Sequence, residues 1–169
     1  MRAYISVGSN IEPEKNLPAA LDLLKQRVRV TAVSTVYRTA PLGDREQPDF
    51  LNAVWQVETE LPPHELKAAL GEVEDALGRE RSAGKYAPRT IDLDLILYGD
   101  ETAYEADLKL PHPDLSRPFV GGPLLELAAD IRLPGTGRPL APMISGRGDR
   151  AIGEPQERLT QLLRARLEP

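Results

Sequence analysis

The sequence predicts an α+β fold in which helices pack on a mostly antiparallel sheet. Its periodic segments follow the order β-α-β-β-α-β and end in a C-terminal extension. No helical segment separates the second strand from the third, whereas a doubly wound fold needs a helix at that point. This order is that of the ferredoxin-like arrangement, and we therefore expect a ferredoxin-like sandwich.

The first half of the chain supplies three of the four strands. An apolar run over 3–7 ends in a Gly-Ser-Asn turn and predicts the first strand. Apolar residues at helical spacing follow from Asn16, which we expect to be the N-cap of the first helix. Residues 29–37 are rich in Val and Thr and predict the second strand. The alternating segment 50–60 predicts a third strand, paired with the second.

The second half begins with a proline-led amphipathic helix from residue 62, which Gly78 is expected to end. A charged loop over 79–88 leads into the fourth strand, at 91–98. A short strand is expected at 108–110, followed by a proline-rich loop at 111–118 and a helix at 124–129.

The C-terminal part differs in composition from the rest of the chain. Glycine and proline dominate residues 134–155, which predicts an extended arm with little core of its own, and a helix follows at 155–167. We therefore divide the chain into a core of residues 1–133 and a segment of residues 134–169, which is either part of the same domain or an appendage.

Composition excludes several classes of function. At 169 residues the chain can bury its own core, and its net charge of −5 is not typical of nucleic-acid-binding proteins. It has no cysteine, which excludes thiol catalysis, and only two histidines, which disfavours a multi-histidine metal site. We find no signal peptide and no apolar run of about 18 residues, so we expect a cytoplasmic protein without a membrane partner.

The strongest functional signal is the predicted strand Arg-Thr-Ile-Asp-Leu-Asp-Leu-Ile-Leu-Tyr at 89–98. Strand alternation puts Asp92 and Asp94 on one face, about 6–7 Å apart at their Cα atoms. The other face would carry Ile91, Leu93, Leu95 and Leu97. Two neighbouring like charges need a cationic partner, and an Asp-x-Asp pair suits Mg²⁺. The alternative is a solvated sheet face with Asp–Arg pairs.

A cationic loop precedes this strand. Its charged residues are Arg79, Arg81, Lys85 and Arg89. Arginine suits phosphate oxygens, and the small residues at 82–84 would let the loop close over a substrate. Alone, such a loop is more often solvated, but its position before the aspartates favours chemistry on a polyphosphate. There is no Walker or dinucleotide glycine motif, so ATP would bind without a P-loop.

Two further loops carry candidate binding residues. In the first, Phe50 offers a ring for stacking and Asn52 an amide for the edge of a heterocycle. In the second, His112 is a candidate hydrogen-bond donor to phosphate and Arg117 a candidate phosphate clamp. For each of these residues, ordinary loop packing is the alternative.

Taken together, these segments resemble the 6-hydroxymethyl-7,8-dihydropterin pyrophosphokinase family of folate biosynthesis. The resemblance covers about residues 4–130 and depends on six motifs in order. They are Val7-Gly-Ser-Asn10, Tyr37-Arg-Thr-Ala-Pro-Leu-Gly43, Gln47-Pro-Asp-Phe-Leu-Asn-Ala53, Gly78-Arg79, Pro88-Arg-Thr-Ile-Asp-Leu-Asp94 and Leu110-Pro-His-Pro113. The family is ferredoxin-like, in agreement with the order of elements.

The resemblance implies roles for individual residues. Asp92 and Asp94 would hold two Mg²⁺ ions around the phosphates of ATP, and Arg79 and Arg89 would assist transfer. The residues implied to bind ATP are Glu74, Arg81, His112 and Arg117. Those implied to bind the pterin are Thr39, Ala40, Leu42, Phe50, Asn52 and Phe119, with the pterin stacked between the two phenylalanines. Tyr86, where the family often has tryptophan, would pack at the closed loop.

The implied reaction is Mg²⁺-dependent transfer of pyrophosphate from ATP to 6-hydroxymethyl-7,8-dihydropterin, with release of AMP. The core of residues 1–133 would be catalytic, in a monomer that can contact other enzymes of the folate pathway. The spacing from His112 to Arg117 is one residue shorter than in the family, a departure that concerns Arg117 and Phe119. The alternatives are a nucleotidyltransferase, which releases pyrophosphate, and a non-catalytic ferredoxin-like module that binds a small ligand.

Overall fold

The computed structural model describes residues 1–40, 46–80, 88–144 and 152–167. Its centre is a sheet with the strand order β5-β1-β4-β3-β8, in which β2 also pairs with β4. The strands are β1 (Arg2–Ser9), β2 (Arg29–Val33), β3 (Tyr37–Thr39), β4 (Phe50–Glu58), β5 (Asp92–Tyr98) and β8 (Glu154–Pro155). All pairings of these strands are antiparallel, as expected.

The predicted second strand, 29–37, is present as two strands along the same edge of β4. β2 pairs with the C-terminal half of β4 and β3 with its N-terminal end. Between them, the backbone N–H of Ser34 donates to the Val54 carbonyl oxygen, and its hydroxyl accepts from the Val54 N–H, both at 2.9 Å. The Ser34 hydroxyl thus replaces a backbone carbonyl as the acceptor of one hydrogen bond between the strands. This explains why β2 and β3 follow the same edge of β4 although the strand is interrupted between them.

Two helices cover one face of the sheet, α1 (Pro13–Leu24) and α2 (Pro63–Ala76). Their apolar residues close the larger core together with the inward face of β4, where Trp55 is completely buried. α2 ends as predicted, with Gly78 at a φ of 78°. The prediction of Asn16 as the N-cap of α1 is wrong: the helix begins three residues earlier, and the Asn16 amide donates to the Ile11 carbonyl oxygen.

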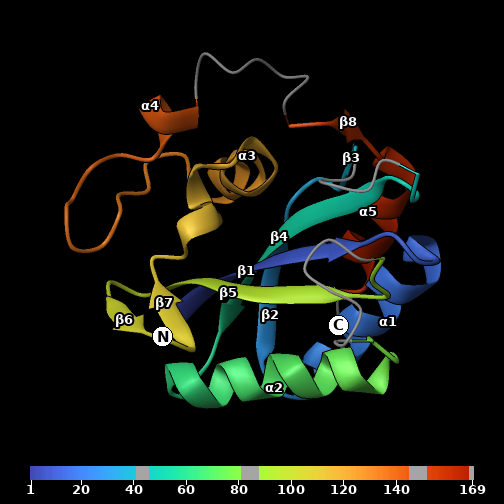
Figure 1. The fold of residues 1–169 in the computed structure, drawn as a ribbon, viewed down its shortest axis with the longest axis horizontal. Helices are drawn as coiled ribbons and strands as arrows, with labels where there is room; N and C mark the ends of the chain where they lie inside the picture. Colours follow the sequence, from blue (N-terminus) through green and yellow to red (C-terminus); the bar gives the residue numbers. More distant parts are fainter. Residues whose placement is uncertain (41–45, 81–87, 145–151, 168–169) are drawn as a thin grey trace.

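A third helix, α3 (Pro118–Leu127), lies on the opposite face, so the sheet is sandwiched between α2 and α3 (Figure 1). The two helices of the predicted β-α-β-β-α-β order therefore share one face, and the helix that follows them in the chain covers the other. We expected this helix to begin at Leu124, but Pro118 takes its first position, where the fixed φ of proline favours a helix start. α3 closes a second apolar cluster over Val54 and Ile96.

A bulge in β5 changes the faces of its last residues. Tyr4 pairs with Leu97 and Ile5 with Leu95, which leaves Ile96 as an extra residue. Leu97 therefore joins the cluster beneath α3 rather than the core that holds Leu95, and the prediction that it shares a face with Leu95 is wrong. The predicted alternation holds before the bulge.

After β5 the chain forms a hairpin of β6 (Ala103–Glu105) and β7 (Leu108–Leu110), which confirms the strand expected at 108–110. A 3-10 helix, η2 (Pro113–Ser116), then leads into α3. No helix in the described residues has the length and apolar character of a membrane span.

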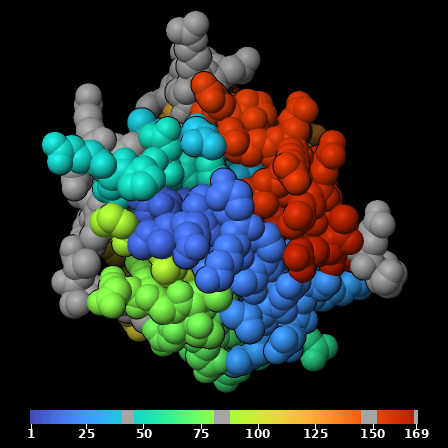
Figure 2. Space-filling view, turned by 90° about the vertical axis from the view of Figure 1, so that its right-hand side faces the viewer, coloured from blue at the N-terminus to red at the C-terminus, as the bar shows by residue number. Residues whose placement is uncertain are grey.

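The C-terminal segment packs on both faces of the sheet. It includes α4 (Ala141–Ile144), β8 and α5 (Glu157–Ala165). Leu140 and Ile144 join the cluster beneath α3, and Leu159 and Leu163 join the larger core. Figure 2 shows α5 lying against α1 on the surface. The described part of residues 134–155 thus contributes buried side chains to the core. The prediction of an arm with little core of its own is wrong here, because high glycine and proline content does not exclude a few buried apolar residues.

Candidate active site

A cavity of about 420 Å³ opens on the face of the sheet that α3 covers only in part. β5, β1 and β4 form its floor, and η2 and α3 form one side. Its lining residues are Ser6, Gly8, Thr39, Ala40, Phe50, Asn52, Arg79, Arg89, Asp92, Asp94, Ile96, His112, Pro113, Asp114, Arg117, Phe119 and Val120. Charged groups and aromatic rings therefore share one cavity.

Asp92 lies between two arginines at the floor of the cavity. Arg79 Nη1 is 2.9 Å from Asp92 Oδ1, and Arg89 Nη1 is 2.6 Å from Asp92 Oδ2. Behind them, the buried carboxylate of Glu74 pairs with Arg79 and accepts from the Leu93 N–H at 3.0 Å. The charge of Asp92 is thus neutralised by the loop that precedes the strand, as the sequence suggested.

Asp94 differs from Asp92, although it shares the same strand face. Its carboxylate has no hydrogen bond or ion pair among the described residues. Burial, together with the negative charges of Asp92 and Glu74, raises the pKa of Asp94 to about 7. Among the described residues no cation pairs directly with this carboxylate, and the nearby charge of Arg79 offsets the rise in its pKa only in part.

This arrangement fits a divalent cation. Two carboxylates on one rigid strand offer hard oxygen ligands, which Mg²⁺ prefers, and a bound polyphosphate would complete the coordination. A cation beside Asp94 would also offset the negative charge that raises its pKa. Asp92 and Asp94 are therefore the residues that could hold metal in this cavity.

The Gly-Ser-Asn turn after β1 positions the arginine that precedes β5. The Asn10 side-chain oxygen accepts from the Arg89 N–H at 2.7 Å, and the N–H of Asn10 donates to the Arg89 carbonyl oxygen at 3.1 Å. The Ser9 hydroxyl donates to the Thr90 carbonyl oxygen at 2.6 Å. A Cβ on Gly8 would lie 2.8 Å from the Asn52 side-chain oxygen, so glycine leaves room for this amide.

The opposite part of the cavity is aromatic and amide-lined. Phe50 and Phe119 line it from β4 and α3, and the Asn52 amide donates to the Thr39 hydroxyl at 2.6 Å. The Arg117 guanidinium lies 5.8 Å from the centroid of the Phe119 ring, in cation–π range. Such a surface can stack a flat heterocycle and bind its edge.

His112 is held as a neutral donor. Its Nδ1 accepts from the Asp114 N–H at 3.0 Å, which caps η2, and burial lowers its pKa. In the neutral ring the proton then lies on Nε2, which suits hydrogen bonding to an anion. Asp114 also pairs with Arg117, 3.0 Å between Oδ1 and Nε, and so orders this side of the cavity.

Residues 4–129 match the family model of 7,8-dihydro-6-hydroxymethylpterin-pyrophosphokinase. The chain belongs to this family. It is 42% identical over 136 residues to the 2-amino-4-hydroxy-6-hydroxymethyldihydropteridine pyrophosphokinase of Haemophilus influenzae, over 78% of this chain and 84% of the relative. It is 40% identical to the folate synthesis bifunctional protein of Arabidopsis thaliana, over 73% of this chain and 26% of that one.

The fold is similar to that of a solved structure described as HPPK-DHPS in complex with substrates. The TM-score is 0.66 at 11% identity, and the likeness covers 85% of this chain and 42% of that one. It supports the mixed architecture of helices and antiparallel sheet.

The structure brings the site residues predicted from the sequence together. All of those it describes line the cavity except Glu74, which lies behind Arg79. Leu42, Arg81 and Tyr86 are outside the described residues. Sequence reasoning missed Ile96, which follows Asp94 at the period of two, and Asp114, which stands two residues after His112. Strand alternation for Ile96, and closeness to His112 for Asp114, could have identified both residues from the sequence.

Proposed function

We propose that this protein, as a pyrophosphokinase of folate biosynthesis, transfers pyrophosphate from ATP to 6-hydroxymethyl-7,8-dihydropterin, producing AMP and the pterin diphosphate. The observation that carries the proposal is the single cavity that joins a floor of carboxylates and arginines to a wall of aromatic rings and an amide. A polyphosphate fits the first surface and a flat heterocycle the second. Membership of the family supports the same reaction.

Asp92 and Asp94 would hold two Mg²⁺ ions. Bound there, the metal would neutralise phosphate charge and align the reacting groups. Asp92 is fixed by two arginines before any substrate binds, whereas Asp94 has no such partner among the described residues. We therefore expect Asp94 to depend on metal for its charge balance more than Asp92.

Arg79 and Arg89 would bind the phosphates of ATP. Both reach the floor of the cavity through their contacts with Asp92, and both remain charged throughout a reaction. Glu74 touches Arg79 rather than the cavity, so we propose that it positions this arginine. Placement of donors where charge develops supplies much of the catalysis in phosphoryl transfer.

On the other side, the pterin would stack between Phe50 and Phe119, with its edge bound by Asn52 and by the backbone near Thr39 and Ala40. His112 and Arg117 would hold the nucleotide, together with Arg81. Leu42 is proposed to contact the pterin and Tyr86 to pack at the closed loop.

The hydroxymethyl oxygen would attack the β-phosphorus, and AMP would leave. The cavity contributes position and charge, and the closing loop would exclude water.

We propose a ferredoxin-like class for the fold and the core of residues 1–133 as the catalytic part. We also propose a cytoplasmic monomer with small-molecule substrates, able to contact other folate enzymes, because the Arabidopsis relative is bifunctional.

Product analysis tests the proposal. Purified protein, Mg²⁺, ATP and the hydroxymethyldihydropterin should yield AMP and a diphosphorylated pterin, whereas Asp92→Asn should yield neither. ADP as the product would indicate an ordinary kinase, and pyrophosphate would indicate a nucleotidyltransferase. If the pterin binds and nothing is transferred, the protein is a ligand-binding module, and the proposed activity is refuted.

A further inference from the structure

The C-terminal residues lie beyond the family match and yet contact β3 and α3, the elements that carry two sides of the cavity. The match ends at residue 129, whereas the described chain continues through 130–144 and 152–167. We define the C-terminal strap as residues 152–163, the β3 wall as Thr39 and Ala40, and the α3 wall as Phe119 and Val120. The strap lies against the elements that carry both walls (Figure 1).

At its first end the strap packs on α3. A Cβ on Gly122 would lie 2.8 Å from Ile152 Cγ1, so the isoleucine occupies the space that glycine leaves on the helix. A Cβ on Gly121 would similarly lie 2.6 Å from Ile144 Cδ1. Two consecutive glycines thus form a flat surface that receives two isoleucines of the C-terminal segment. The two glycines come directly after the residues of the α3 wall in the sequence.

At its second end the strap pairs with β3. Tyr37 pairs with Pro155 and Arg38 with Glu154, which makes β8 the outer strand of the sheet. Gly153 approaches β3 so closely, at a φ of 116°, that a Cβ would lie 2.5 Å from the Arg38 carbonyl oxygen and 2.9 Å from Thr39 Cγ2. The strap therefore contacts a residue of the β3 wall directly.

A buried hydroxyl group of the strap is hydrogen-bonded to the residue that precedes β3. Thr160, on α5, is 3% exposed, and its Oγ1 accepts from the Val36 N–H at 2.9 Å. The Gln156 N–H donates to the Val36 carbonyl oxygen at 2.7 Å. Both polar groups of Val36, which precedes β3, are thus satisfied by the strap. Because β3 is only three residues long, these bonds and its pairing with β4 together determine where it lies.

We propose that the C-terminal strap positions the acceptor side of the cavity by holding the β3 wall and the α3 wall at a fixed separation. This inference rests on the proposed function, because it takes the pterin to bind between these walls. The strap touches neither of the aspartates nor the arginines that pair with them in the described residues. Its residues are therefore positioning residues, expected to govern the affinity for the acceptor and not the transfer step.

The test uses Thr160→Val, which removes the hydroxyl at the β3 end, and Ile152→Ala, which removes the contact at the α3 end. Thr160→Ser keeps the hydroxyl and should restore wild-type behaviour. Leu162→Ala is the matched control, since Leu162 lies on the same helix and is 41% exposed. The measurements are the fluorescence titration of 6-hydroxymethylpterin with Mg²⁺ and a non-hydrolysable ATP analogue present, and steady-state kinetics.

We expect Thr160→Val and Ile152→Ala to weaken pterin binding and raise its KM by about five- to tenfold. The kcat and the KM for ATP should stay within about twofold of wild type. Ile152 is only half-buried, so its variant should fold even if Thr160→Val does not. Unchanged pterin affinity in a folded variant, or an equal loss for ATP, would overturn the positioning role. A wild-type protein that binds no pterin would refute the proposed function instead.

Discussion

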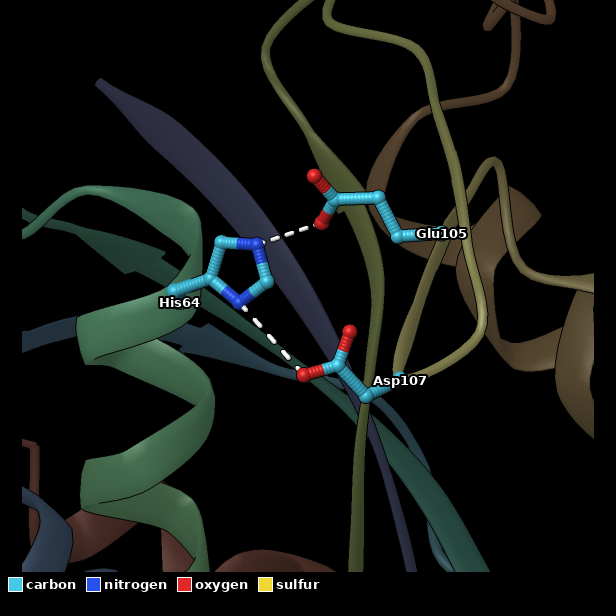
Figure 3. A group of neighbouring side chains, drawn as sticks. All are labelled: His64, Glu105 and Asp107. Carbon is cyan, nitrogen blue, oxygen red and sulfur yellow. Dashed lines mark hydrogen bonds and ion pairs between the residues drawn. The ribbon is translucent and has the colours of Figure 1, made fainter.

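Two groups of neighbouring carboxylates in the described part of the chain differ in what neutralises them. In the cavity, Asp92 pairs with two arginines and Asp94 pairs with no cation in the described residues. On the surface, Glu105 and Asp107 flank the ring of His64, at 2.5 Å from Nε2 and 4.0 Å from Nδ1 (Figure 3). The surface group has an imidazole between its carboxylates, whereas in the cavity the carboxylate of Asp94 has no cation paired with it among the described residues.

Exposure explains why this difference matters. The side chains of the surface group are 53%, 56% and 74% exposed, so water screens their charges. Asp94 lies in the cavity, where burial is the largest cause of its raised pKa. The carboxylates of the surface group also face opposite nitrogens of one ring, and only one nitrogen can bind a given ion. Similar residue types thus predict a metal requirement in one place and a weak surface ion pair in the other.

The largest expected effect is that of Asp94→Asn on activity. Removal of this carboxylate should lower the kcat by more than about 10³-fold, because the phosphate charge loses its counter-ion at the floor of the cavity. The measurement is AMP release at saturating Mg²⁺. Glu105→Gln is the matched control and should keep wild-type activity. A comparable loss in both variants would mean that the two carboxylate groups do not differ as described.

Arg89→Ala should have the next largest effect. It removes a donor from the floor of the cavity and should lower the kcat by about 10²–10³-fold. Arg27→Ala, which breaks the exposed pair with Glu72, is the control and should leave the rate unchanged. The two variants are compared at equal ATP saturation. A wild-type rate for Arg89→Ala would show that this arginine does not contribute to catalysis.

The metal-free protein should become more stable as the pH falls from about 8 to 5. The pKa of Asp94 is raised to about 7 in the folded protein, so the folded state binds a proton that the unfolded state binds only near pH 4. Its contribution is therefore unfavourable above about pH 7 and disappears as the pH falls.

In Asp94→Asn this dependence should be absent. The variant should be more stable than wild type at pH 8 by on the order of 1–3 kcal/mol, after allowance for partial solvent access. Urea unfolding in EDTA at pH 5 and 8 measures both effects. An Asp94→Asn variant with the wild-type slope between these values would assign the pH dependence to another group.

The smallest expected effect is that of His64→Ala at the surface group. It removes the imidazole between Glu105 and Asp107, but exposed pairs contribute only about 0–1 kcal/mol. Thermal unfolding should change by a few degrees at most, and the kcat should not change. A loss of activity would instead link the β6–β7 hairpin to the cavity.

The sequence predicted much of the candidate site because its determinants are local. Alternation places Asp92 and Asp94 on one face, and the arginines that compensate them precede them in the chain. The bulge at Ile96 could not be predicted, because it depends on register with β1, a strand far away in sequence. The position of α3 on the opposite face has the same cause, since tertiary packing decides which side a helix covers.

Residues that act across large sequence separations were predicted least well. Asn10 contacts Arg89 from 79 residues away, and the Gly-Ser-Asn turn alone signalled only a turn. Thr160 reaches Val36 over 124 residues, and nothing near Thr160 in the sequence indicates a buried hydrogen bond. Both contacts are created by the sheet and its edge rather than by a motif.

The most direct test of the difference between the two carboxylate groups is a Mn²⁺ titration followed by electron paramagnetic resonance. It uses wild type, Asp94→Asn and Glu105→Gln with a non-hydrolysable ATP analogue, after subtraction of the binding to free analogue. Wild type and Glu105→Gln should bind two ions per chain, and Asp94→Asn should lose at least one of them. Equal binding by Asp94→Asn, or a loss in Glu105→Gln, would contradict the assignment of the metal to the cavity.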